Sequence, residues 1–244
     1  MPDPTPRSPR RSDALSRERI VEAAIQILDT GGESGLTVRA VTAHLSTGRG
    51  AIYHHVADKD ELLAAAADSV IATVMVGVGV DGDEDPKRAI RALALGIFDA
   101  IDAHPWVGTQ LSREPLQPAV LRIWRSVGSY LQSLGATGPA RSDAGSALVN
   151  YVLGSAAQHA AGARRMVRET DRKAYLEAFA AQWTHHDPDP IAQEAAALVP
   201  GHDDREQFLA GVDIFLLGIT AGLQATAAGA DHRAGVPTEP RPRR

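Results

Sequence analysis

The 244-residue sequence contains no cysteine. This absence excludes a disulfide framework, a thiol nucleophile and a thiolate metal site, and it is typical of a protein of the cytoplasm. The first twenty residues, MPDPTPRSPRRSDALSRERI, contain no apolar stretch between their arginines. We therefore do not expect a signal peptide, and we expect a cytoplasmic location.

An excess of positive charge is also missing, since the net charge is −5. Residues 1–60 carry eight basic and eight acidic side chains, so the whole negative charge lies in the remainder of the chain. Bulk charge therefore gives no support to nucleic-acid binding, and any such function must rest on a local motif.

Sites for chemistry are equally scarce. No paired carboxylates, nucleophile elbow or metal motif stands on a recognisable element, so we expect no enzyme, metal site or cofactor. The acidic stretch 77–86 begins with the spacing of a calcium loop, but Pro86 stands where that loop needs glycine. His185 and His186 are neighbours in sequence and do not share a helix face, which favours a solvated loop over a metal site.

The segment 36–63, LTVRAVTAHLSTGRGAIYHHVADKDELL, has the pattern of two short helices, a turn and the start of a longer helix. Thr37 is a good N-cap, and Leu36 and Val41 have the spacing of a hydrophobic staple. We expect the turn at 46–48, where Gly48 permits a backbone that other residues resist. Two short helices joined in this way form a helix-turn-helix, whose second helix enters the major groove of DNA.

The second short helix is predicted over roughly 49–56, with Ile52 and Val56 buried and the polar side chains facing outward. Tyr53 and His55 can donate to phosphate oxygens, and Arg49 can reach a phosphate or a guanine edge. The complete set of predicted DNA-contacting residues is Thr37, Arg39, Thr47, Gly48, Arg49, Gly50, Tyr53, His54, His55 and Lys59.

The same segment resembles the DNA-binding domain of the tetracycline-repressor (TetR) family of bacterial transcription regulators. The resemblance rests on Leu36-Thr37-Val38, Leu45, Ala51-Ile52-Tyr53, His55-Val56 and the run from Asp58 to Leu63. Three positions depart from the family pattern: Ser46-Thr47 replaces the usual Gly-Val, and Gly48 replaces the usual serine cap. The resemblance implies an all-α fold with an N-terminal three-helix DNA-binding domain and a C-terminal helical domain for ligand binding and dimerisation.

The chain divides into four predicted ranges. These are an arm at 1–13, a helix-turn-helix domain at 14–60, a ligand-binding and dimerisation domain at 61–230, and a tail at 231–244. The arm and the tail are expected to be disordered because they are rich in proline, arginine and polar residues. The arginines of the arm could follow the DNA backbone or enter its minor groove, or they could belong to a solvated tail.

Helical periodicity predicts the remaining elements. The helices are expected over 16–30, 58–77, 86–104, 117–134, 142–167, 171–183 and 204–228, and a loop is expected over 184–199. The helix at 142–167 should present a stripe formed by Ala147, Leu148, Tyr151, Ser155 and His159. The helix at 204–228 is apolar nearly all the way round; Asp213 and a run of small residues argue against a membrane span.

The family resemblance also implies partners. The last two long helices of each subunit would pair across a two-fold axis to form a homodimer, and two recognition helices would then meet double-stranded operator DNA. A small-molecule effector would bind between the C-terminal helices, where the predicted pocket residues are Met75, Trp106, Trp124, Tyr151 and Gln158. The leading hypothesis is a repressor released by that ligand. The alternatives are a DNA-binding or protein-interaction module without a ligand, and a helical enzyme.

Overall fold

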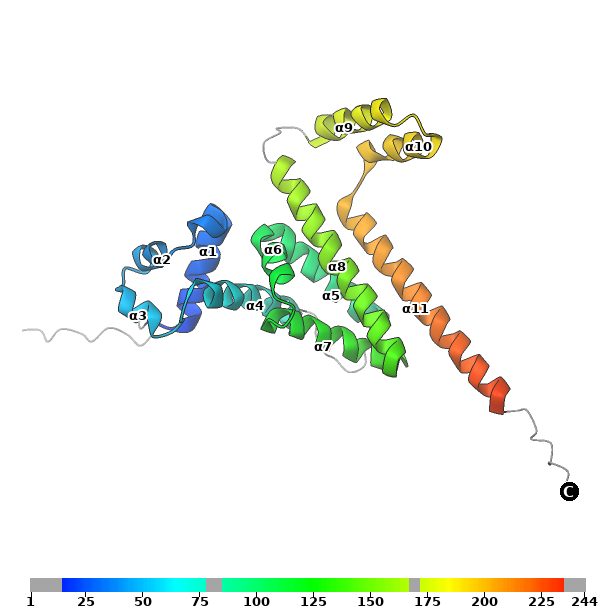
Figure 1. Ribbon diagram of the computed structural model, residues 1–244, viewed down its shortest axis with the longest axis horizontal. Helices are drawn as coiled ribbons and strands as arrows, with labels where there is room; N and C mark the ends of the chain where they lie inside the picture. The colour runs from blue at the N-terminus through cyan, green and yellow to red at the C-terminus, as the bar shows by residue number, and fades with distance from the viewer. Residues whose placement is uncertain (1–14, 78–84, 167–171, 235–244) are drawn as a thin grey trace, which may run out of the picture.

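The computed structural model describes residues 15–77, 85–166 and 172–234 (Figure 1). Within these ranges the chain forms eleven α-helices, one short 3-10 helix and no strand, so the predicted all-α fold is confirmed for the described residues. The arm at 1–13 and the acidic stretch 78–84 lie outside them. So does the predicted tail, except for its first residues, 231–234, which continue the last helix.

The first four helices hold the sequence motif. They are α1 (Arg17–Gly35), α2 (Val38–His44), α3 (Arg49–Tyr53) and α4 (Lys59–Gly77). Ser16 caps α1 by accepting from the backbone N–H of Arg19. The helix is kinked at Gly32, whose φ of 61° is in the left-handed region, so the helix predicted to end at residue 30 breaks here and continues to Gly35.

Seven further helices complete the chain. They are α5 (Pro86–Ala103), α6 (Pro105–Arg113), α7 (Pro118–Ser133), α8 (Gly138–Met166), α9 (Arg172–His186), α10 (Pro190–Leu198) and α11 (Asp204–Ala234), with the 3-10 helix η2 (Val199–Gly201) after α10. Figure 1 shows α4 leading from the motif into the helices α5 to α8, with α11 running along their far side and α9 and α10 projecting from one end.

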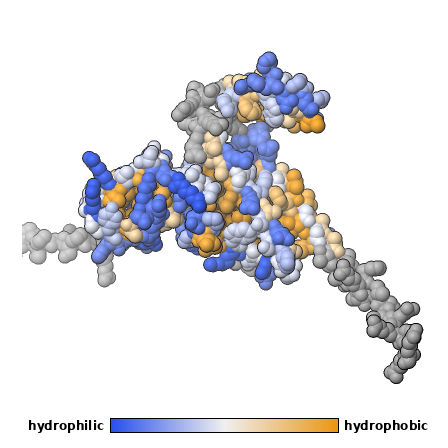
Figure 2. Space-filling view, viewed as in Figure 1, coloured by the Kyte–Doolittle hydropathy of each residue, from blue (hydrophilic) through white to orange (hydrophobic). Residues whose placement is uncertain are grey.

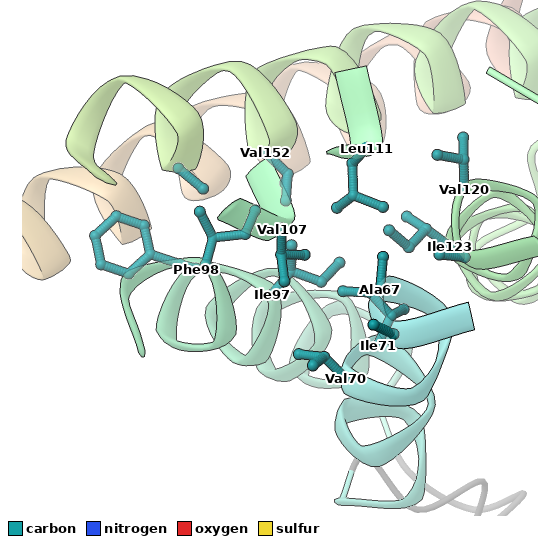
Figure 3. Packing of buried hydrophobic residues seen from close by; sticks show 14 of the residues in the cluster. Ala67, Val70, Ile71, Ile97, Phe98, Val107, Leu111, Val120, Ile123 and Val152 are labelled. Carbon is teal, nitrogen blue, oxygen red and sulfur yellow. The ribbon is translucent and has the colours of Figure 1, made fainter. Parts of the chain in front are cut away.

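The core is built where α4, α5, α6, α7 and α8 meet. Figure 3 shows Ile71 of α4, Ile97 of α5, Val107 of α6 and Ile123 of α7 converging, and each is at most 1% exposed. Burying a side chain of this size stabilises the fold by about 1.5–3 kcal/mol. The same packing therefore fixes the direction of α4, which carries the helix-turn-helix at its other end.

The structure corrects two sequence predictions for the C-terminal helices. In the predicted stripe of α8, Leu148 is buried and Tyr151, Ser155 and His159 are half-buried, but Ala147 is exposed. The most buried residues of α8 include Leu148, Val149, Val152 and Ala156, because α5 and α7 cover a neighbouring face of that helix. The stretch 184–199 is not a loop, because α10 occupies Pro190–Leu198.

Candidate nucleic-acid interface and ligand region

The first helix of the motif begins as its sequence predicts. The hydroxyl of Thr37 accepts from the backbone N–H of Ala40 at 3.1 Å, which satisfies one of the unpaired donors of the first turn. Leu36 and Val41 on either side of this cap are both buried, at 1% and 0% exposure. The cap and the apolar pair together fix where α2 starts and which of its faces packs on α1.

The turn after α2 differs from the prediction. The residue in the left-handed region is Ser46, with φ of 51°, whereas Gly48 has ordinary extended angles (φ −89°, ψ 154°). The N–H of Thr47 donates to the carbonyl of Thr42 at 3.0 Å, and that of Ser46 to Ala43 at 3.4 Å. This pair of bonds is a Schellman motif, in which the left-handed position normally carries glycine. The prediction that Gly48 supplies the unusual backbone was therefore wrong.

The second helix, α3, is shorter than predicted. It spans Arg49–Tyr53, follows Gly48 without a side-chain cap, and is followed by the C-cap residue His54, whereas the prediction extended it to residue 56. Ile52 is 1% exposed and anchors the helix, while Tyr53 is 54% exposed. One side of a short helix is thus fixed to the core while the opposite side is open to a partner.

The junction with α4 is tied together by charged groups. Asp58 accepts from the N–H of Glu61 at 2.8 Å, and the Glu61 carboxylate accepts from the N–H of Ala57 at 2.7 Å and pairs with Arg17 of α1 at 2.7 Å. Asp58 and Glu61 therefore form a capping interaction at the start of α4, in which the return bond of Glu61 is made to Ala57. Lys59 donates from Nζ to the carbonyl of Glu33 at 2.8 Å, which joins the start of α4 to the end of α1.

The predicted DNA-contacting residues lie along α2, the turn, α3 and the start of α4. Most of them are exposed, and only Thr47 and His55 are half-buried. Among the described residues, neither Arg39 nor Arg49 has an ion-pair partner. Figure 2 shows hydrophilic side chains on this part of the chain, with apolar patches between them. The arrangement can present free guanidinium groups, a phenol and imidazoles to an anionic polymer.

Sequence reasoning did not find the network that joins α1 to α6. The carboxylate of Asp29 lies 2.8 Å from Nδ1 of His104 and accepts from the indole N–H of Trp106 at 2.8 Å. Arg113 donates to both carboxylate oxygens of Glu33, at 2.9 and 2.6 Å. We call this set the α1–α6 clamp. Its partners stand far apart in sequence, so no local spacing could have predicted it.

The electrostatics of the clamp follow from that geometry. The hydrogen bonds from Arg113 lower the pKa of Glu33 below its ordinary value of 4.5, although partial burial acts in the opposite direction. The same hydrogen bonds raise the pKa of Arg113. Both groups are therefore charged at neutral pH, and the pair connects the DNA-binding unit to the helices of the C-terminal domain.

The predicted ligand-binding residues have different surroundings in the structure. Trp106 is 7% exposed and is held by Asp29, while Gln158 lies on the exposed surface of α8. Tyr151 donates from its hydroxyl to the carbonyl of Phe208 at 3.0 Å and stacks on that ring. Met75 lies against Ser126, and Trp124 lines a surface groove between α7 and α8.

Between α5, α7 and α8 the core is almost closed. A space of about 10 Å³ remains there, and its lining is wholly apolar, formed by Ile90, Leu93, Ala94, Ile97, Ile123, Val127, Leu148, Val149 and Val152. This space is smaller than any drug-sized molecule requires. A ligand entering here must therefore separate the helices.

The helix α11 has the length and composition of a membrane span over Asp204–Ala225, with mean hydropathy of 1.7. Its Asp213 forms an ion pair with Arg91 of α5, whose Nη1 lies 2.6 Å from Oδ1. Phe208, Val212 and Leu216 are buried against the rest of the chain. The pair and these contacts are those of a helix packed on protein, and only part of its surface is covered. Within the described ranges, no group of three or more metal-ligating side chains forms a metal site.

Comparison with known proteins adds to this geometry. Residues 20–66 match the family described as bacterial regulatory proteins, tetR family. The chain is 33% identical over 155 residues to the HTH-type transcriptional repressor DrrR1 of Streptomyces coeruleorubidus, a match that covers 62% of this chain and 57% of that protein. It is 30% identical over 223 residues to an HTH-type transcriptional regulator of Saccharopolyspora erythraea, covering 88% of this chain and 89% of the relative.

Solved structures give the same result. A TetR transcriptional regulator from Streptomyces coelicolor is 45% identical, with a TM-score of 0.76 and coverage of 85% of this chain and 99% of that one. The TetR family protein ActR of the same organism, solved in complex with actinorhodin, has a TM-score of 0.69 at 22% identity over 86% of this chain and 99% of ActR, and shares the fold. The helix-turn-helix, the helical C-terminal domain and the near full-length relatives agree, and the chain belongs to the tetR family of bacterial transcription regulators.

Proposed function

We propose that this regulator is a cytoplasmic repressor that binds operator DNA as a homodimer and is released from it by a small molecule. The observation that carries the proposal is the arrangement of α3, which is anchored by the buried Ile52 and exposes Tyr53 and Arg49. A helix held in this way can enter the major groove without rearrangement of the domain.

The DNA contacts divide into two kinds. Thr37, Thr47, Tyr53 and His55 serve as donors to phosphate oxygens, which set the register of the protein on the duplex. Arg49, at the first position of α3, is placed to read a guanine edge. Gly50 has open space around it, so the helix backbone can approach the bases closely there. Lys59 lies at the start of α4, where its ammonium group can contact a phosphate while it also donates to the carbonyl of Glu33 at the end of α1.

A dimer supplies the second recognition helix. On α11, Ile214 and Leu217 are 70% and 69% exposed, although the opposite face of the same helix is packed on α5 and α8. Apolar colour is visible along this helix in Figure 2. An exposed apolar face of a long helix is typical of a surface that another protein covers. We propose that α8 and α11 of two copies pack together and bring two α3 helices to half-sites about 34 Å apart.

The dimer is tested by light scattering on the purified protein. Leu217→Glu places a charge in the proposed interface and should convert a dimer to a monomer. Leu116→Glu, which alters a side chain that is 73% exposed and lies between α6 and α7, is the matched control and should remain dimeric. A wild-type monomer, or a dimer that survives Leu217→Glu, would contradict this part of the proposal.

Release by a ligand requires two states of the protein. ActR was solved with actinorhodin and a TetR variant of Acinetobacter baumannii with minocycline, which supports a similar capacity in this chain. Because the core between α5, α7 and α8 is closed here, the bound state must open it, and the ligand must bind that state more tightly to shift the population. The α1–α6 clamp would connect a rearrangement of the C-terminal helices to the DNA-binding unit, because it joins α6 to α1.

The closed core also favours a second candidate, a DNA-binding regulator or interaction module without a small-molecule ligand. The two are separated by titrating the protein–operator complex with a panel of hydrophobic drug-like compounds. Release of DNA, together with slower hydrogen exchange in α5 and α8, supports the ligand-responsive repressor. DNA binding that no compound weakens supports the second candidate. The operator itself is found by selecting bound fragments from the organism's own genomic DNA.

A further inference from the structure

The groove between α7 and α8 that Trp124 lines takes no part in the operator contacts or in the closed core between α5, α7 and α8. Its volume is about 510 Å³, within the range of small-molecule sites. It lies where the two helices leave their connecting turn, at the end of the domain away from α2 and α3 (Figure 1). The groove is lined by Trp124, Arg125, Gly128, Ser129 and Gln132 of α7 and by Gly138, Arg141, Ser142 and Gly145 of α8.

The charge of the lining has one sign. Two of the nine lining residues are arginines and none is acidic, although the chain as a whole carries a net charge of −5. Arg141 is oriented by Gln132, whose amide oxygen accepts from its Nη1 at 2.8 Å. Arg125 has no ion-pair partner among the described residues. A lining with two arginines, one of them held in place, and no acidic residue favours an anionic group such as a carboxylate or a phosphate.

The shape of the lining adds an apolar planar surface. A Cβ added at Gly145 would lie 3.1 Å from Cζ3 of Trp124, so the indole ring rests directly against the backbone of α8. Trp124 is only half-buried, and it is one of the residues that line the groove. At Gly128 an added Cβ meets nothing within 4 Å, so the floor beside the ring is open. A flat aromatic body can therefore lie against the indole while its anionic group meets the arginines.

We propose that this groove binds a small aromatic carboxylate, independently of the core between α5 and α8. The guanidinium groups of Arg125 and Arg141 bind the carboxylate from the two walls, and Trp124 contacts the aromatic ring. The site is separate from the operator-binding surface and does not depend on the dimer or on the repressor function, so its test is made without DNA.

The test uses 1-naphthoate as the probe and the full chain labelled with 5-fluorotryptophan. The sequence has three tryptophans, so ¹⁹F spectra contain a reporter in the groove, Trp124, and two outside it, Trp106 and Trp183. A Trp124→Phe sample assigns the first. We expect 1-naphthoate to shift the Trp124 signal saturably and to leave the other two unchanged, with neutral 1-naphthamide binding at least about tenfold more weakly.

Two variants localise the binding. Arg125→Gln/Arg141→Gln should weaken naphthoate binding at least about tenfold, because both charge-assisted contacts are lost. Gly128→Leu places a side chain in the open part of the groove beside Trp124 and leaves both arginines unchanged. Leucine favours helix, so α7 should keep its structure, and the added side chain should block the probe. Lys173→Gln on α9 removes one positive charge elsewhere and should change nothing. Absence of a Trp124 shift, equal binding of the amide, or full affinity in either groove variant would overturn the proposal.

Discussion

Most substitutions destabilise a protein, but the left-handed backbone of Ser46, in the turn of the helix-turn-helix, predicts a substitution that stabilises it. Ser46 has φ of 51°, is exposed, and occupies the position after the end of α2 that glycine fills in a Schellman motif. We therefore expect Ser46→Gly to stabilise the protein. Ala43→Gly, an exposed position inside α2, is the matched control, because the same residue is introduced three positions away in helical backbone.

The size of the effect follows from two opposing terms. A residue other than glycine in the left-handed region costs about 1–2 kcal/mol. Glycine also makes the unfolded chain more flexible, which takes back about 0.4–1 kcal/mol. The net gain for Ser46→Gly is therefore about 0.5–1 kcal/mol, or roughly 1–4 °C in Tm for a chain of this size. Ala43→Gly should instead lose about 1 kcal/mol, because glycine is a poor helix former.

Differential scanning calorimetry of the three proteins at pH 7 measures both effects. The reasoning is supported when the Tm of Ser46→Gly rises and that of Ala43→Gly falls. A lower Tm for Ser46→Gly would show that the serine side chain, and not its backbone angle, stabilises the turn. Equal losses in both variants would show that glycine costs the same at the two positions, which contradicts the left-handed conformation of Ser46.

Two further predictions concern the contacts between helices. Because Arg113 lowers the pKa of Glu33, the stabilisation from their ion pair is fully present above pH 4.5 and is lost as the pH falls through the lowered pKa. Urea titration should therefore give wild type a slightly higher unfolding free energy than Arg113→Gln at pH 7 and no difference in acid. A difference that persists at pH 2 would refute this. A Cβ added at Gly96 would lie 2.6 Å from Cγ1 of Val74, so Gly96→Ala should lower the unfolding free energy by about 1–3 kcal/mol by forcing α4 and α5 apart. The control is Gly154→Ala, where an added Cβ meets nothing within 4 Å. In the same titration it should raise the unfolding free energy by up to about 1 kcal/mol.

Much of the DNA-binding unit could be predicted from the sequence because its determinants are local. The cap at Thr37, the staple of Leu36 and Val41, and the Asp58 cap of α4 each depend on residues within a few positions of one another. Such features can be recognised from the spacing of residues in the sequence, and the family resemblance supports the same assignment of helices and turn. The turn was the exception, because the identity of a residue does not show which position of a turn takes the left-handed angle.

The C-terminal domain was less predictable because its determinants are not local. The α1–α6 clamp joins Asp29 and Glu33 to residues of α6, and no spacing rule connects such distant positions. The closure of the core depends on how α5, α7 and α8 pack together. The helix α10 did have a local signal that was overlooked: Asp189 caps it by accepting from the N–H of Ile191, and Pro190 occupies its first turn.

The central claim is that α3 binds operator DNA, and one titration tests it most directly. A fluorescent duplex carrying the selected operator is titrated with wild type, with Tyr53→Ala/His55→Ala and with the control Phe179→Ala, which alters an exposed ring on α9. Wild type and Phe179→Ala should bind tightly and lose affinity as salt rises, whereas the double variant should bind no better than to random DNA while keeping its Tm. Equal operator affinity in the folded double variant would contradict the claim.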